Sequence, residues 1–176
     1  MKNRTYFKLN GHRVVLDSGP QETLLEALRN RLGVKSPKCG CDRGDCGTCT
    51  VMIDGRTCRS CLVLAVEVDG REVTTLEGLM ADGELTPLQK VFLDHNSFQC
   101  GFCAPGMILS ATELLQRNSV PSEEQIKQAI AGNLCRCTGY QPIIDAIKEC
   151  VKNSAKTDPS LIPSPKRRRE SPGRRK

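Results

Sequence analysis

The chain has 176 residues, a formal net charge of +6, 38% hydrophobic and 3% aromatic residues, and no tryptophan. This length allows one or two small domains, and the shortage of large rings means that neither can depend on an aromatic core. No run of residues is apolar enough for a transmembrane helix, and the segment from Met1 to Phe7 does not resemble a secretory signal, so we expect a cytoplasmic protein.

The positive charge is concentrated at the C-terminal end. From residue 158 onwards, seven basic and two acidic residues account for five of the six net charges. The remainder of the chain is therefore nearly neutral, and its basic residues are not interleaved with aromatic ones, so nucleic-acid binding is not expected. Residues 157–176, which are basic and rich in proline, are predicted to form a tail outside the folded domains.

Residues 1–79 have the pattern of a small sheet with one helix. Residues 4–9 and 12–16 flank Asn10-Gly11 and predict a β-hairpin, because Asn-Gly fits the two-residue turn that matches strand twist. Leucines at helical spacing then predict a helix over residues 22–32 that ends at Gly33. Short strands are predicted at residues 51–53 and 72–74.

A glycine-rich loop between these elements contains the first group of cysteines. Cys41, Cys46 and Cys49 have the C-x4-C-x2-C spacing of plant-type 2Fe-2S proteins, in which a fourth cysteine follows further along the chain. The residues alone leave that fourth ligand open between Cys58 and Cys61, although the spacing excludes Cys39. A zinc site is the alternative, but zinc sites favour paired C-x2-C units or histidines, and His12 and His95 are far from these cysteines in sequence.

Residues 80–86 are predicted to be a linker, and residues 80–156 a domain of four helices. Apolar periodicity and caps place the helices at residues 87–95, 106–117, 122–131 and 142–152. The pair Cys100 and Cys103 precedes the second of these helices, and the pair Cys135 and Cys137 lies in the turn before the last. We expect the bundle to bring the two pairs together around a second cluster, and Cys150 to be a small buried side chain.

Five segments together identify a family resemblance: KCGCDRGDCGTCTV at residues 38–51, Asp54-Gly55, SCL at 60–62, QCGFCAPGM at 99–107 and GNLCRCTGY at 132–140. They resemble the iron-sulfur small subunits of the xanthine dehydrogenase family of molybdenum hydroxylases, over about residues 4–152. Thr48 and Ala104 are mild departures from the common pattern, and neither is a ligand.

The resemblance implies an α+β protein, with a plant-ferredoxin-like (β-grasp) domain followed by an all-α four-helix domain. Each domain would hold one 2Fe-2S cluster, and Cys61 would be the fourth ligand of the first. The implied function is that of an electron-transfer subunit with no catalytic centre of its own, which passes electrons from a molybdopterin centre through both clusters to a flavin or another acceptor.

The resemblance also implies partners. The second cluster would lie beside the molybdopterin of a large subunit, with Gln99 and Cys137 approaching the pterin. The first cluster, with residues 42–45 nearest, would face FAD on a medium subunit, and the whole complex would be a dimer of heterotrimers. The alternative function is a free-standing ferredoxin-like carrier, which would need no such partners.

Overall fold

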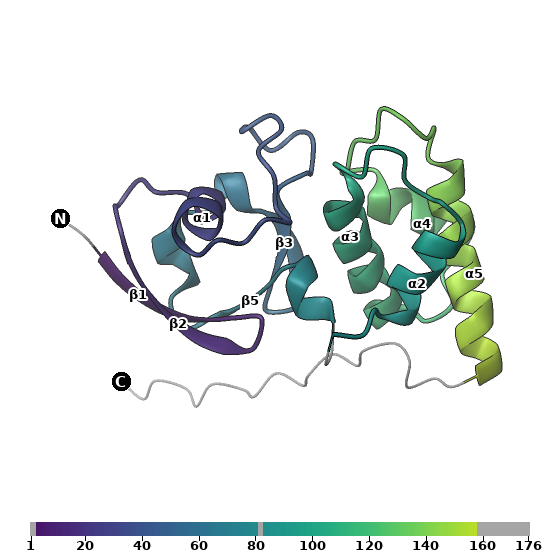
Figure 1. Cartoon of the computed structure of the whole chain (residues 1–176), viewed down its shortest axis with the longest axis horizontal. Helices are drawn as coiled ribbons and strands as arrows, with labels where there is room; N and C mark the ends of the chain where they lie inside the picture. Colours follow the sequence, from purple (N-terminus) through teal and green to yellow (C-terminus); the bar gives the residue numbers. More distant parts are fainter. Residues whose placement is uncertain (1–2, 81–82, 158–176) are drawn as a thin grey trace, which may run out of the picture.

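The computed structural model describes residues 3–80 and 83–157. Figure 1 shows two parts side by side, a sheet with its covering helix formed by the first half of the chain and a group of helices formed by the second. The predicted tail at residues 157–176 lies, except for Thr157, outside the described residues. None of the helices in the described ranges has the length and hydrophobicity that a membrane span requires.

The sheet has five strands in the order β2-β1-β5-β3-β4. Strands β1 (Asn3–Leu9) and β2 (His12–Ser18) form the predicted antiparallel hairpin, and the turn residues Asn10 and Gly11 have φ values of 52° and 84°, as a two-residue turn of this kind needs. Strand β5 (Glu72–Thr74) runs parallel to β1 and antiparallel to β3 (Thr50–Ile53). The edge strand β4 (Arg56–Arg59) was not predicted, because its polar sequence lacks an apolar alternation.

One face of the sheet is covered by a helix that begins at Thr23. The Thr23 side chain accepts a hydrogen bond from the Glu26 amide, and the Glu26 carboxylate accepts one from the Thr23 amide. The helix runs as α1 (Leu24–Glu26) and continues with π-helical geometry as η1 (Ala27–Arg31), so the helix predicted at residues 22–32 is present in a shorter form. Leu24 and Leu28 are fully buried against Val51 and Val73 of the sheet.

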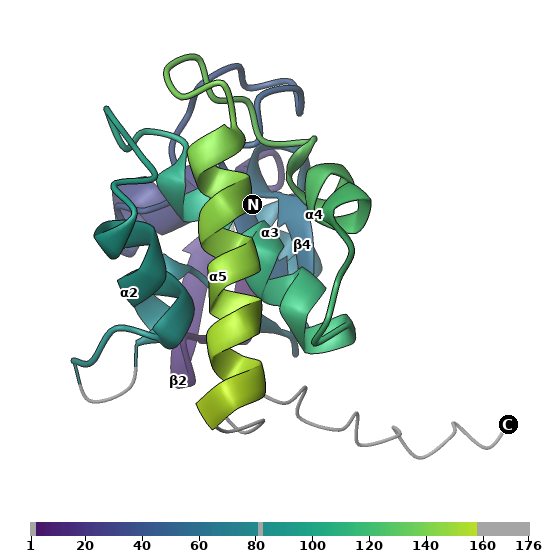
Figure 2. The same ribbon diagram turned by 90° about the vertical axis from the view of Figure 1, so that its right-hand side faces the viewer.

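Four helices make up the second part, as predicted: α2 (Pro87–Asp94), α3 (Ala104–Arg117), α4 (Glu123–Ile130) and α5 (Gln141–Thr157). Helices α2 and α4 start at the capping boxes of Thr86 and Ser122. Helix α5 packs against α2 and α4, and Figure 2 shows it crossing in front of α3. Ile143 and Ile147 of α5 are fully buried in this core together with Met107 of α3.

The two parts meet where α3 packs against β3 and β4. Gly106, near the start of α3, makes this contact possible: a Cβ at this position would lie 2.5 Å from Asn133 Nδ2 and 2.6 Å from the Gly47 carbonyl oxygen. The backbone of α3 therefore approaches the cysteine loop of the first part more closely than any other residue type would allow.

Candidate functional sites

The first group of cysteines lies on a loop at one end of the sheet. Cys41, Cys46 and Cys49 lie between η1 and β3, and Cys61 lies in the 3-10 helix η2 (Ser60–Leu62) after β4. The Cys49 and Cys61 side chains are buried with their Sγ atoms 3.4 Å apart, while Cys41 and Cys46 are half-buried. The structure therefore brings the sulfurs of Cys49 and Cys61 together from segments on either side of β3 and β4.

The backbone of this loop points N–H groups at the sulfurs. The Cys46 amide donates to Cys41 Sγ over 3.4 Å, and hydrogen bonds from the amides of Arg43 and Cys46 lower the pKa of Cys41 to about 7. Positive φ values at Asp42, Gly44 and Gly47 produce the curvature that such N–H donation requires. Burial, in contrast, raises the pKa of Cys61 to about 12, which favours the neutral thiol where no cation is bound.

The second group of cysteines joins two separate turns of the helical part. Cys100 and Cys103 lie just before α3, and Cys135 and Cys137 lie between α4 and α5. The Sγ atoms of Cys100 and Cys137 are 3.6 Å apart. Burial and the neighbouring Cys135 side chain raise the pKa of Cys103 to about 12, whereas the Phe102 amide lowers the pKa of Cys100 by donating to its sulfur.

Both groups are organised as pairs of sulfurs. Two thiolates bound to one tetrahedral metal at about 2.3 Å would lie about 3.8 Å apart, close to the observed separations of 3.4 Å for Cys49 and Cys61 and 3.6 Å for Cys100 and Cys137. Among the described residues, no three His, Cys, Asp or Glu side chains converge as a single-ion site would need. Pairs of this kind fit a two-iron cluster, in which each iron takes two thiolates, better than they fit one zinc ion.

Gln99 lies at the exposed edge of the second group. Its Nε2 donates to the Cys137 carbonyl oxygen over 3.2 Å, and both Gln99 and Cys137 are exposed. The two residues expected to approach a pterin are thus adjacent to each other and open to a partner.

The three remaining cysteines have different environments. Cys39 is exposed, Cys58 is half-buried on β4 opposite Val51, and Cys150 is buried in the helical core, as predicted. Burial raises the pKa of Cys58 to about 11, which favours the neutral thiol at this position. His12 and His95 are both exposed, as expected for histidines that are not ligands.

A hydrogen-bonded junction connects the two cysteine loops, and sequence reasoning missed it. The Leu134 amide donates to the Cys46 carbonyl oxygen over 2.9 Å, which links the residue before Cys135 directly to a cysteine of the other group. Beside this bond, Asn133 is 1% exposed, and its Nδ2 donates to the Gly47 carbonyl oxygen over 2.9 Å and to Thr50 Oγ1 over 3.1 Å. The only sequence signal was a polar asparagine two residues before Cys135.

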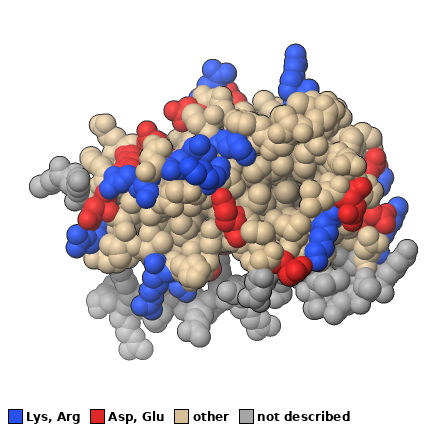
Figure 3. Space-filling model, in the orientation of Figure 1, with Lys and Arg blue, Asp and Glu red and all other residues tan. Residues whose placement is uncertain are grey.

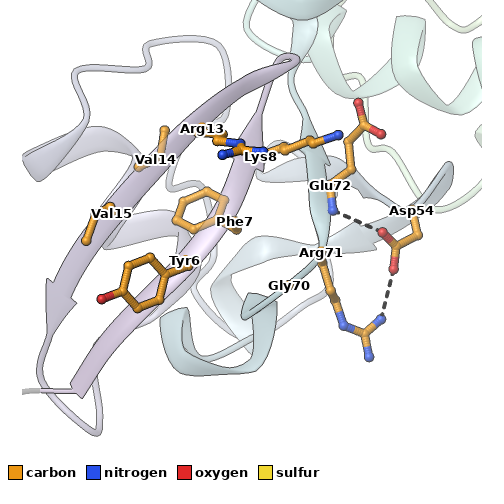
Figure 4. A pocket seen from close by; sticks show the side chains of 10 residues that line it. All are labelled: Tyr6, Phe7, Lys8, Arg13, Val14, Val15, Asp54, Gly70, Arg71 and Glu72. Carbon is orange, nitrogen blue, oxygen red and sulfur yellow. Dashed lines mark hydrogen bonds and ion pairs between the residues drawn. The ribbon is translucent and has the colours of Figure 1, made fainter. Parts of the chain in front are cut away.

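Away from these loops, the described residues form a mixed charged surface and one hollow. Figure 3 shows basic and acidic side chains interspersed over the face it presents. A shallow hollow of about 780 Å³ lies along the β1–β2 hairpin, and Figure 4 shows it between Tyr6, Lys8 and the ion pair of Arg71 with Asp54. No cysteine lines this hollow, so it is separate from both sulfur groups.

Two family models match the chain, a 2Fe-2S iron-sulfur cluster binding domain at residues 7–88 and a [2Fe-2S] binding domain at residues 75–148. The nicotine 6-hydroxylase small subunit of Paenarthrobacter nicotinovorans is 48% identical over 80% of this chain and 84% of its own length. The nicotinate dehydrogenase small FeS subunit of Eubacterium barkeri is 44% identical over 84% of this chain and 94% of its own.

Solved structures agree with these relatives. A chain of quinoline 2-oxidoreductase from Pseudomonas putida 86 superposes with a TM-score of 0.84 at 42% identity, over 88% of this chain and 96% of that one. The confirmed fold is a plant-ferredoxin-like domain followed by a helical 2Fe-2S domain, and the free-standing carrier is not favoured. The chain belongs to the iron-sulfur small subunits of the molybdenum hydroxylase family, electron-transfer components without a catalytic centre of their own.

Proposed function

We propose that the two groups of cysteines hold the two 2Fe-2S clusters of a cytoplasmic molybdenum hydroxylase complex. Cys41, Cys46, Cys49 and Cys61 would hold the first cluster, and Cys100, Cys103, Cys135 and Cys137 the second. The observation that supports this assignment is the close approach of one sulfur pair in each group, Cys49 to Cys61 at 3.4 Å and Cys100 to Cys137 at 3.6 Å, the second pair from residues 37 positions apart in sequence. When bound, each cluster accepts and returns one electron.

The protein's own residues would hold and tune these clusters. Thiolates supply four negative charges per group, and amide donors such as the Cys46 N–H on Cys41 Sγ offset part of that charge. Thr48 and Thr138 place hydroxyl groups 3.2 Å from the sulfurs of Cys46 and Cys135. The hydrogen bond from the Leu134 amide to the Cys46 carbonyl oxygen links the two groups of cysteines. Together with the covalent bonds on either side, it would provide a short path for electron transfer between the clusters.

The partners follow from where apolar side chains remain exposed. Leu62 beside the first group is 62% exposed, and Phe102 and Leu134 beside the second are 45% and 55% exposed. Apolar side chains gathered around both cysteine loops support coverage by other subunits. We assign Gln99 and Cys137 to the side facing molybdopterin on a large subunit and residues 42–45 to the side facing FAD on a medium subunit, in a dimer of heterotrimers.

The ligand assignment is tested by replacing Cys137 and Cys61 separately with serine in the native complex. Each variant should lose the electron paramagnetic resonance signal of one reduced cluster and about half the iron of the small subunit, while the other signal remains. Cys58→Ala is the matched control and should keep both signals, because Cys58 lies on β4 outside the first group. An intact pair of signals in Cys61→Ser, or a lost signal in Cys58→Ala, would show that the fourth ligand is misassigned.

A further inference from the structure

Lys38 belongs to the first cysteine loop through its backbone. Its amide donates to the Thr48 carbonyl oxygen over 2.9 Å, and its carbonyl oxygen accepts from Thr48 Oγ1 over 2.9 Å. Thr48 itself lies between Cys46 and Cys49, and its hydroxyl is 3.2 Å from Cys46 Sγ. The backbone of Lys38 is thus fixed to the part of the loop that would hold the first cluster.

The side chain of Lys38 leaves that loop and reaches the second one. Its Nζ donates to the Phe102 carbonyl oxygen over 3.3 Å and lies 5.4 Å from the centre of the Phe102 ring. Phe102 stands between Cys100 and Cys103, and its own amide donates to the Cys100 sulfur. The ammonium group consequently interacts electrostatically with the sulfurs of Cys103 and Cys100, which belong to the other domain.

The segment that carries Lys38 is fixed from two sides. Arg29 Nη1 donates to the carbonyl oxygens of Pro37 over 2.7 Å and Lys35 over 3.1 Å. The Glu77 carboxylate accepts from the Ser36 hydroxyl over 2.5 Å and from the Ser36 amide over 2.9 Å. The Lys38 ammonium group also donates to the Ser36 carbonyl oxygen of this fixed segment over 3.3 Å, so two carbonyl oxygens hold the charge in place.

We propose that Lys38 is a positioning residue of the first domain whose ammonium group raises the reduction potential of the second cluster. The inference rests on the proposed assignment of Cys100, Cys103, Cys135 and Cys137 to that cluster. One-electron reduction by an external donor adds one negative charge to the four-thiolate group and changes no bond. A cation held near the sulfurs favours the more negative, reduced state, and partial burial limits the screening of this attraction by water and salt.

The contact also acts through a peptide group. The Phe102 carbonyl oxygen, which accepts from Lys38, belongs to the same peptide as the Cys103 N–H. A cation on that oxygen polarises the peptide and strengthens the positive end at the Cys103 N–H, which donates to the Cys103 sulfur. The charge and the peptide polarisation therefore act in the same direction on the potential of the second cluster.

The test is a redox titration of the native complex, followed through the separate electron paramagnetic resonance signals of the two clusters. Lys38→Gln and Lys38→Met should both shift the midpoint of the second cluster to more negative values, with a smaller shift at the first. Lys38→Arg, which keeps the charge, should stay close to the wild type. Lys35→Gln is the matched control, because it removes the same charge from an exposed side chain three residues away.

Two neutral variants of different shape, Lys38→Gln and Lys38→Met, are used so that the test still holds if one of them fails to fold. The proposal is overturned if the neutral variants move the second midpoint no more than Lys35→Gln does, or if both clusters shift equally. A wild-type complex without a second-cluster signal would instead contradict the ligand assignment, so the two failures are distinguishable.

Discussion

The cysteines that lie outside the two groups differ in how far water reaches them. Cys39 is exposed beside the first cysteine loop, whereas Cys150 is 4% exposed in the helical core. Cys58 is half-buried among the apolar side chains of the first core, and this burial accounts for a pKa near 11. Local environment, and not proximity in sequence, therefore decides which spare thiol is available to react.

These environments predict the pattern of alkylation in the isolated small subunit. Iodoacetamide at pH 8 should label Cys39 and leave Cys58 and Cys150 unmodified, since the thiolate is the reactive form and burial keeps the latter two neutral and covered. Labelling of Cys39 should rise about tenfold per pH unit below its pKa, which lies above its usual value mainly because of desolvation. Peptide mass spectrometry checks this, and prompt labelling of Cys58 would contradict it.

At the scale of elements, one carboxylate fastens α3 to the edge of the sheet. Glu113 of α3 accepts from the Thr57 amide over 2.9 Å and from the Thr57 hydroxyl over 2.5 Å. Its other oxygen forms ion pairs with Arg56 at 3.0 Å and Arg117 at 3.3 Å. The unpredicted strand β4 is thereby ordered by a side chain of α3 that lies 56 positions after Thr57.

Removing this carboxylate should loosen the contact between helix and strand. Glu113→Ala is expected to destabilise the protein by about 2 kcal/mol, because the Thr57 amide and hydroxyl lose their acceptor. In a chain of this size the thermal midpoint should fall by about 5 °C, measured as loss of visible cluster absorbance on heating. The matched control is Glu149→Ala, which breaks a partly exposed ion pair with Lys152 on α5 and should change the midpoint by about 1 °C or less. Equal shifts of the thermal midpoint in Glu113→Ala and Glu149→Ala would contradict the role assigned to Glu113.

At the scale of the whole molecule, the two domains are held in one arrangement at their cysteine loops. Asn133 is central to this junction: its Oδ1 accepts from the Ser110 hydroxyl of α3 over 2.8 Å while its Nδ2 donates to Gly47 and Thr50 of the first domain. Arg59 of β4 adds a bond to the Gly132 carbonyl oxygen. The separation of the two clusters is therefore set by buried polar contacts as well as by apolar packing.

Asn133→Ala should weaken that junction without removing a cysteine. Three buried hydrogen bonds are lost, so we expect about 2 kcal/mol of destabilisation and a change in the magnetic interaction between the two reduced clusters. Iron content should stay at the wild-type value. Asn30→Ala, at an exposed position on η1, is the matched control. A magnetic interaction identical to the wild type would mean that other contacts fix the distance between the clusters.

The sequence alone determined the four helices and the hairpin, because local signals specify each of them, whereas the plant-ferredoxin-like fold class came from the family resemblance of the cysteine segments. The Asn10-Gly11 turn, the caps at Thr86 and Ser122 and the helical leucine spacing all act within a few residues. Cysteine spacing likewise identified the other candidate ligands but left the fourth ligand of the first group open between Cys58 and Cys61, and only the family resemblance selected Cys61.

Only the tertiary structure decided how the two domains face each other. The bond from Leu134 to Cys46, the buried Asn133 and the reach of Lys38 to Phe102 each join residues more than sixty positions apart. Strand β4 also depends on partners outside itself, Thr50–Ile53 of β3 and Glu113 of α3. Contacts of this kind leave no periodic pattern in the chain, because their geometry exists only after both domains have packed together.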